Sequence, residues 1–222
     1  MIEKKRKWDL EVSPDFFPDF NFDSLEKARR VISIIRRNLP KDFIKSRSEI
    51  VCKEIARSQD FVLAKKIACF FGTKGEPDTS YMLKYHREKF ICLPKVVGDE
   101  IVFLKFEGKL KRGAFGIPEP SSDYIVPPQE IDLFLVPGVI FDLRGFRVGY
   151  GKGFYDKVLS RSSAKAKKVA LCWSFQVFKE IKCEKPHDIF VDEIWTESFV
   201  VYPSFARSSK NSVLVRVLDI FS

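Results

Sequence analysis

Apolar runs of strand length alternate with helical patterns along most of this chain. The runs are rich in β-branched or aromatic residues and occupy residues 66–71, 90–93, 101–106, 131–136, 168–173 and 189–195. Helical patterns begin at Asp23-Ser24 and near Ser46 or Ser48, and further ones cover residues 78–86, 153–162 and 177–181. Strands that alternate with helices favour a mainly parallel sheet covered on both faces. We therefore predict an α/β fold, a single three-layer domain with a mainly parallel sheet flanked by helices.

The domain organisation follows from where this alternation starts and stops. The 222 residues suffice for one α/β domain, which we place at residues 23–197. Residues 1–22 are charged and then rich in Phe, Pro and Asp, so we interpret them as an N-terminal extension that is either draped over the core or mobile. Residues 198–222 form a C-terminal extension, which we expect to pack on the domain or on another copy.

The composition is typical of a cytoplasmic protein. No apolar run reaches the roughly 18–20 residues of a membrane span. The basic residues 1–7 are followed by Trp8-Asp9-Leu10-Glu11 instead of an apolar segment, which argues against a signal peptide. The five cysteines are odd in number and have no Cys-x-x-Cys spacing, so we expect neither a disulfide framework nor a zinc site. We predict a cytoplasmic location and no membrane partner.

The net charge of +9 leaves two classes of partner open. A basic surface attracts anionic small molecules, and it also binds nucleic acids. The sequence contains no helix-turn-helix, zinc-finger or aromatic ribonucleoprotein motif. We therefore expect small anionic ligands and no nucleic acid, and we keep a basic RNA- or protein-binding module as the least favoured alternative.

The stretch 136–156 carries the richest chemistry in the chain. Its glycines stand at every second position, at Gly149, Gly151 and Gly153. Glycines let backbone N–H groups approach a ligand closely, and such groups beside a helix N-terminus bind phosphate. The spacing matches neither the P-loop nor the dinucleotide-binding pattern, and a glycine-rich turn between a strand and a helix is the plainer alternative.

Charged residues around these glycines favour a binding site. Arg147 and Lys152 are able to neutralise phosphate charge, and Asp156 follows within one helical turn, where it is able to hold a divalent cation. Taken alone, Asp156 would more often cap a helix by charge–dipole attraction. The combination predicts a nucleotide-phosphate and magnesium site at the C-terminal end of a strand, where ligands gather in parallel α/β folds.

The same stretch resembles the signature of the 5-formyltetrahydrofolate cyclo-ligase (methenyltetrahydrofolate synthetase) family, which reads roughly PGxxFDxxGxRxGxGxGYYD. Residues Pro137 to Asp156 match nearly every fixed position, with Phe154 where the family usually has Tyr. The resemblance extends from about Ser24 to about Glu197 and implies a Rossmann-like fold of the cyclo-ligase type. It also implies a monomeric enzyme that uses ATP and magnesium to convert 5-formyltetrahydrofolate to 5,10-methenyltetrahydrofolate, with release of ADP and phosphate.

The resemblance also implies roles for individual residues. The ATP-binding set comprises Arg29, Arg147, Gly149, Tyr150, Gly151, Lys152, Gly153, Phe154 and Tyr155. The substrate-binding set comprises Phe71, Glu76, Phe115, Tyr150, Gly151, Lys152, Gly153 and Phe154. Lys152 and Arg147 carry over as catalytic residues, and Asp156 and Asp188 as magnesium ligands. A carboxylate such as Glu76 suits the pterin edge, because reduced pterins present adjacent N–H donors.

One position departs from the family pattern. The family usually opens its first helix with Lys-x-x-x-Arg, and here Leu25 stands at the Lys position while Arg29 matches the Arg. Either the nucleotide loses one contact, or a residue of the N-terminal extension replaces it. A relative of the same fold that binds a nucleotide but acts on another substrate therefore stays open as an alternative.

Overall fold

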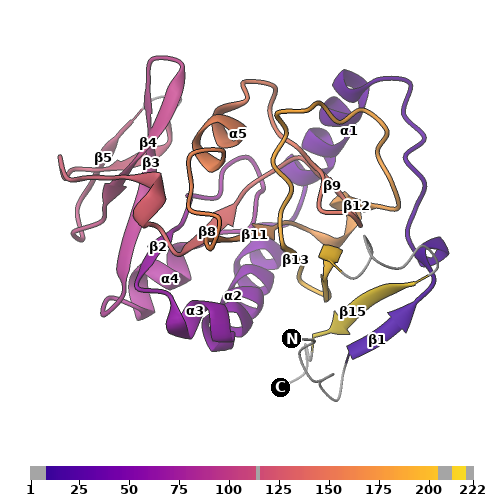
Figure 1. Ribbon diagram of the computed structural model, residues 1–222, viewed down its shortest axis with the longest axis horizontal. Helices are drawn as coiled ribbons and strands as arrows, with labels where there is room; N and C mark the ends of the chain where they lie inside the picture. Colours follow the sequence, from indigo (N-terminus) through magenta and orange to yellow (C-terminus); the bar gives the residue numbers. More distant parts are fainter. Residues whose placement is uncertain (1–8, 114–115, 205–211, 219–222) are drawn as a thin grey trace.

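A ten-stranded sheet runs through the molecule in the order β1-β15-β14-β13-β11-β8-β2-β3-β4-β7 (Figure 1). The computed structural model describes residues 9–113, 116–204 and 212–218. The strands are β1 (Asp9–Val12), β2 (Lys66–Ala68), β3 (Phe90–Val97), β4 (Glu100–Lys105), β7 (Ile125–Val126), β8 (Leu133–Val136), β11 (Lys167–Leu171), β13 (Glu193–Trp195), β14 (Phe199–Val201) and β15 (Val213–Val217). The central strands β13, β11, β8, β2 and β3 pair in parallel. The pairs at both edges are antiparallel.

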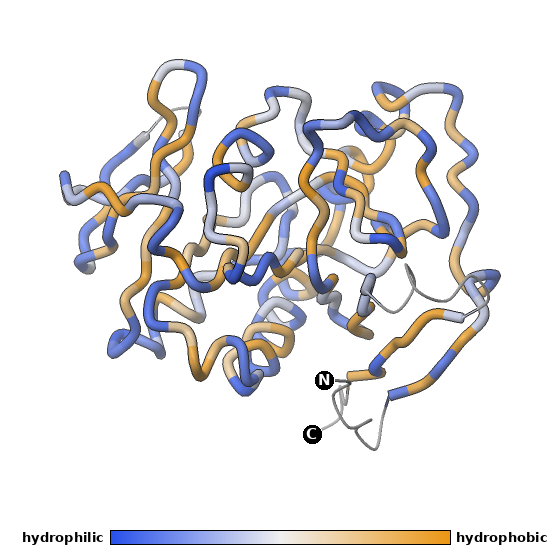
Figure 2. Tube along the Cα trace, in the orientation of Figure 1, coloured by the Kyte–Doolittle hydropathy of each residue, from blue (hydrophilic) through white to orange (hydrophobic). Residues whose placement is uncertain are grey.

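Alternate side chains of the central strands enter two different hydrophobic layers. In β8, Leu133 and Leu135 join one buried cluster while Phe134 and Val136 join the other. Strands buried on both faces read as continuous apolar runs, which is why the sequence pattern located them. Figure 2 shows hydrophobic colours along this central part of the trace and hydrophilic colours on the outer loops.

Helices cover both faces of the sheet, which confirms the predicted three-layer α/β fold. The helices are α1 (Leu25–Arg37), α2 (Lys41–Arg57), α3 (Gln59–Leu63), α4 (Ser80–Tyr85) and α5 (Phe154–Leu159). Helices α2, α3 and α4 pack on one face, and α5 packs on the other beside a small sheet of order β10-β9-β12. That sheet consists of β9 (Ile140–Asp142), β10 (Arg147–Val148) and β12 (Val177–Phe178), and a separate hairpin of β5 (Leu110–Arg112) and β6 (Pro118–Pro120) lies near β3 and β4. No helix within the described residues is both long and apolar enough to cross a membrane.

Helix α1 packs on the small sheet formed by β10, β9 and β12. Its N-terminus is capped by Ser24, whose side chain accepts a hydrogen bond from the backbone of Lys27, so the predicted helix start is confirmed. Ala28 and Ile32 are buried against Val139, Ile140 and neighbouring apolar residues of β9, β10 and β12.

The described part of the N-terminal extension belongs to the sheet. Strand β1 pairs with β15 of the C-terminal extension, from Asp9 opposite Arg216 to Val12 opposite Val213. The following segment, residues 13–24, crosses to α1 along one side of the molecule (indigo in Figure 1). Three of its phenylalanines pack edge-on against the core: Phe17 against Phe199, and both Phe20 and Phe22 against Phe178.

Two sequence predictions about local structure were wrong. The second helix begins at Lys41, after Pro40, and not near Ser46 or Ser48. The Ser46 hydroxyl instead donates to the carbonyl of Asp42 inside the helix. Residues 177–181 are not helical, because Val177 and Phe178 form β12 and pair in parallel with β9.

Candidate active site

The C-terminal ends of three central strands meet at one place beside α1. The loop after β2 carries Glu76, the loop after β8 carries Gly138, and Trp173 follows β11. The Trp173 indole N–H donates to the carbonyl of Gly75 at 2.7 Å, which ties the first loop to the third. This is the edge where ligands bind in parallel α/β folds, and the glycine-rich residues lie over it.

Three hydrogen bonds and one ion pair surround the buried Glu76 carboxylate. Its Oε2 accepts hydrogen bonds from the backbone N–H of Thr73 at 3.0 Å and from the Thr73 hydroxyl at 3.2 Å. Its Oε1 accepts from the Tyr150 hydroxyl at 2.5 Å and lies 3.5 Å from the Arg36 guanidinium. The residue expected to bind the pterin and a residue of the glycine loop are therefore in direct contact.

Arg36 is a site residue that the sequence analysis missed. Its side chain is fully buried, and it donates to the Gly138 carbonyl at 3.1 Å and to the Tyr150 hydroxyl at 2.5 Å. The signal available in the sequence was its position, because Ala28, Ile32 and Arg36 recur every four residues on one helix face. A charge on an apolar face requires a buried partner, and here that partner is the Tyr150–Glu76 pair.

The glycine loop connects β10 to α5 and spans residues 149–153. Gly151 and Gly153 have φ values of 94° and 66°, a region in which other residues are strained. The Arg29 side chain donates to the Gly149 carbonyl at 2.8 Å, so α1 holds the start of the loop. Lys152 is exposed at its tip, and Tyr150 is half exposed although its hydroxyl is turned inward. Burial of this hydroxyl raises the pKa of Tyr150, and the charge of Glu76 adds to the shift while that of Arg36 opposes it.

Arg147 and Asp156 form a nearly buried ion pair at the base of this loop. Nη2 of Arg147 donates to Oδ1 of Asp156 at 2.8 Å, and the exposed fractions of the two side chains are 3% and 16%. Nε of Arg147 is buried and has no hydrogen-bond partner within the described residues. A Cβ atom at Gly149 would fall 2.7 Å from Nη1 of Arg147. Glycine at this position therefore leaves room for the guanidinium to face the loop.

The two carboxylates expected to bind magnesium lie on neighbouring segments. Oδ1 of Asp156 accepts a hydrogen bond from the backbone N–H of Ile189 at 3.4 Å, so Asp156 contacts the residue that follows Asp188. Oδ2 of Asp188 accepts from the backbone of Lys185 at 2.6 Å. In the described part of the chain, no hydrogen bond or ion pair links the two carboxylates, and no group of three His, Cys, Asp or Glu residues is arranged for a metal. A magnesium ion held here would have to take most of its ligands from phosphate and water.

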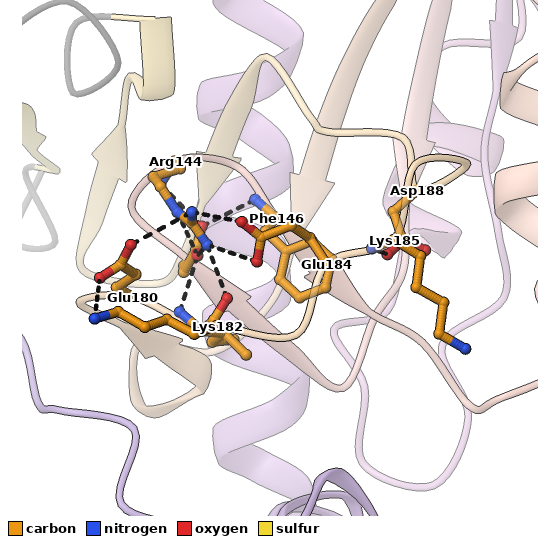
Figure 3. A network of polar contacts seen from close by, with 9 residues as sticks. Arg144, Phe146, Glu180, Lys182, Glu184, Lys185 and Asp188 are labelled. Carbon is orange, nitrogen blue, oxygen red and sulfur yellow. Dashed lines mark hydrogen bonds and ion pairs between the residues drawn. The ribbon is translucent and has the colours of Figure 1, made fainter.

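A network centred on Arg144 fixes the loop that leads to Asp188 (Figure 3). The buried carboxylate of Asp142 accepts hydrogen bonds from Nε and Nη2 of Arg144 at 3.0 and 2.8 Å. It also accepts from the backbone N–H groups of Arg144, Phe146 and Ile181. Burial raises the pKa of Asp142, and Arg144 opposes the rise. Arg144 further contacts the carboxylates of Glu180 and Glu184, so β9 and residues 180–184 are held together.

The aromatic residues of the predicted sets are spread around the site. Phe71 follows β2 and is half buried against the layer of α2 to α4, whereas Phe154 and Tyr155 pack against the opposite layer from the first turn of α5. The Tyr155 ring lies under the Arg147 guanidinium, at 5.6 Å from its carbon, and burial raises the pKa of Tyr155. Phe115 lies outside the described residues.

Leu25 is part of an apolar cluster and not of the polar site. It is half buried beside Phe20, Phe22 and other residues of the small-sheet layer. Residues 9–22 contain neither Lys nor Arg, so the described part of the N-terminal extension offers no basic side chain in its place. A hydrophobic contact with this segment stands where the family usually has its lysine.

Comparison with known proteins identifies the family. A sequence model of the 5-formyltetrahydrofolate cyclo-ligase family matches residues 22–197. A 5-formyltetrahydrofolate cyclo-ligase of Haemophilus influenzae is 33% identical over 43% of this chain and 56% of its own length. A probable 5-formyltetrahydrofolate cyclo-ligase of Schizosaccharomyces pombe is 27% identical over 69% of this chain and 86% of its own length.

Solved structures agree with this assignment. The 5,10-methenyltetrahydrofolate synthetase of Aquifex aeolicus superposes with a TM-score of 0.72 and 38% identity, covering 80% of this chain and 92% of the other. The family match spans most of the chain and includes the loops that carry Glu76, the glycines and Asp188. The chain is thus an enzyme that belongs to the 5-formyltetrahydrofolate cyclo-ligase family.

Proposed function

We propose that this enzyme converts 5-formyltetrahydrofolate to 5,10-methenyltetrahydrofolate with ATP and magnesium, releasing ADP and phosphate. The observation that carries the proposal is the contact between Glu76 and Tyr150, with 2.5 Å between the carboxylate and the hydroxyl. It joins the residue expected to bind the pterin to the loop expected to bind the nucleotide. A reaction between two bound molecules requires such adjacency, because the reacting atoms must be held within about 3–3.5 Å of each other.

The chemistry begins with a formyl group whose amide-like resonance makes its carbon a poor electrophile. Transfer of the γ-phosphoryl group from ATP to the formyl oxygen turns that oxygen into a leaving group. The N10 atom of the folate then attacks the formyl carbon and loses its proton, the ring closes, and the oxygen departs as part of the phosphate. Each step requires alignment and charge screening, and none requires a covalent bond to the protein.

The protein groups at the site suit these tasks. Arg147 has a buried Nε that finds no hydrogen-bond partner among the described residues, and the exposed Lys152 stands at the loop tip. Both are able to screen the transferring phosphoryl group, while the loop N–H groups at the start of α5 bind its oxygens. Glu76 orients the pterin by accepting hydrogen bonds from its N–H groups.

Asp156 and Asp188 are the residues that would hold the magnesium ion. When bound, the ion would neutralise charge on the nucleotide phosphates. Arg147 forms an ion pair with Asp156. We expect a nucleotide phosphate to replace Asp156 as the partner of Arg147, and the magnesium ion to replace Arg147 as the partner of Asp156. Cytoplasmic location and a monomeric state remain predictions.

The test is formation of the methenyl product, followed by its near-ultraviolet absorbance. Purified protein is mixed with 5-formyltetrahydrofolate, ATP and magnesium, and each component is omitted in turn. We expect product only when all three are present. A folded protein that binds the nucleotide but forms no product would instead favour a family relative with another substrate, for which the Leu25 position is the available support.

A further inference from the structure

We infer that Tyr150 occupies the pterin position at Glu76 until a nucleotide moves the glycine loop, so that the two substrates bind with positive coupling. The inference rests on the proposed function and extends it to the order and energetics of binding. It assigns Tyr150 a positioning role: its hydroxyl competes with the folate for one carboxylate oxygen.

The first argument is the hydrogen bonding of Glu76. A carboxylate has about four acceptor positions; here three of them accept hydrogen bonds from Thr73 and Tyr150, and the Arg36 guanidinium lies 3.5 Å from Oε1. A pterin that donates two adjacent N–H groups to this carboxylate must therefore displace a protein donor. An incoming ligand gains little by replacing one hydrogen bond with another, so the contact reduces folate affinity in the nucleotide-free enzyme.

The second argument identifies Tyr150 as the donor that leaves. Thr73 binds through its own backbone as well as its hydroxyl, within the same turn as Glu76. Arg36 is fully buried and is also held by the Gly138 carbonyl. Tyr150 alone among these three donors is half exposed, and it stands between two glycines of a surface loop. The loop is able to move without disturbing the core, whereas the other donors are not.

The third argument connects this movement to the nucleotide. The loop is tied to the rest of the site at two neighbouring residues, through Gly149 to Arg29 and through Tyr150 to Glu76 and Arg36. A phosphate that binds Arg29 breaks the hydrogen bond from Arg29 to the Gly149 carbonyl. A pterin that binds Glu76 breaks the hydrogen bond from the Tyr150 hydroxyl to Glu76. Each ligand thereby releases one tie of the same loop, which lowers the cost of releasing the other. Linkage requires the effect to be equal in both directions.

The experiment measures folate affinity with and without a nucleotide. Calorimetric titration of the enzyme with 5-formyltetrahydrofolate is repeated with magnesium and the non-hydrolysable β,γ-imido analogue of ATP. We expect the analogue to tighten folate binding at least about fivefold, the lower end of ordinary allosteric coupling. In Tyr150→Phe, which keeps the ring and loses the hydroxyl, folate should bind more tightly without the analogue, and the ratio of the two dissociation constants should fall towards one.

Thr73→Val supplies the matched control. It removes a hydroxyl donor from the same carboxylate, but Thr73 makes no hydrogen bond to the glycine loop. We expect both dissociation constants to shift together, so that their ratio stays at the wild-type value. A wild-type ratio of one, or a ratio in Tyr150→Phe equal to that of the wild type, would overturn the coupling while leaving the proposed function intact. Absence of folate binding under both conditions would overturn the proposed function as well. The wild-type ratio decides the question even when a variant does not fold.

Discussion

Arg144→Met should destabilise the protein by removing the guanidinium that faces the buried carboxylate of Asp142. The two side chains share hydrogen bonds of 3.0 and 2.8 Å, Asp142 is fully buried, and the Arg144 side chain is 26% exposed. Removing one partner of a buried pair costs about 3–5 kcal/mol. Backbone N–H groups of Arg144, Phe146 and Ile181 still bind the carboxylate in the variant, and water screens the exposed quarter of the pair. We therefore expect a loss of about 2–3 kcal/mol at neutral pH.

The loss should depend on pH, and the direction follows from the pKa of Asp142. Burial already raises this pKa, and Arg144 opposes the rise. Without Arg144 the folded-state pKa rises further above its unfolded value. A group with a raised folded pKa contributes stability that is present at low pH and is lost as the pH increases through the folded pKa. The deficit of the variant should therefore be smaller near pH ~4, close to the ordinary aspartate pKa, than at neutral pH.

Urea unfolding at both pH values measures the effect. The slope of the unfolding free energy against urea must match that of the wild type for the comparison to hold. Arg161→Met is the matched control, because Arg161 pairs with Glu100 at 3.0 Å on the surface, where the two side chains are 44% and 48% exposed. We expect the control to cost less than about 1 kcal/mol. The reasoning is refuted if Arg144→Met costs no more than the control, or if its deficit is the same at both pH values.

Other changes test the site directly. Lys152→Ala should lower turnover at least about 100-fold through loss of charge screening, and it should leave the melting temperature unchanged because Lys152 is exposed. The control Lys165→Ala, at another exposed lysine, should change neither turnover nor melting temperature. Near-parental turnover in Lys152→Ala would exclude the loop lysine from the reaction. Leu25→Lys should lower the KM for ATP and also the melting temperature, because Leu25 packs beside Phe22; an unchanged KM would show that this helix position does not reach the nucleotide. Burial raises the pKa of Tyr150, so its hydroxyl should remain protonated at the ordinary tyrosine pKa of about 10 and ionise only as the pH rises further. Comparing the tyrosinate absorbance of the wild type with that of Tyr150→Phe checks this, and ionisation of Tyr150 at the ordinary pKa would contradict the buried position of its hydroxyl.

The parts of the fold that the sequence predicted are those set by local pattern. Strands at 131–136 and 168–173 were found because burial on both faces produces continuous apolar runs. The start of α1 was found because Ser24 is a strong N-cap residue followed by helical periodicity. The glycine loop was expected directly after the strand at 131–136, but β9 and β10 intervene, so that the loop leaves β10 of the small sheet and leads into α5.

The parts that could not be predicted depend on contacts between distant segments. Arg36 binds Gly138, which is 102 residues away, and Tyr150, which is 114 residues away. No local pattern contains either partner. Residues 177–181 were misassigned because β12 is only two residues long, too short for a local pattern, and is defined by its pairing with β9. The start of α2 was missed because its N-cap is Pro40, which makes no side-chain capping hydrogen bond of the kind that Ser24 makes at α1.

The pairing of β1 with β15 has a consequence for how the chain is made. Synthesis proceeds from the N-terminus, so β1 is the first strand of the large sheet to emerge and β15, its partner, is the last. The phenylalanines that follow β1 also lack their packing partners at first, because Phe178 and Phe199 are synthesised late. Domains fold as units during synthesis, but here the N-terminal segment cannot join its unit until almost the whole chain has left the ribosome. Among the described strands, β1 therefore gains its partner later in synthesis than any of the central strands gains one.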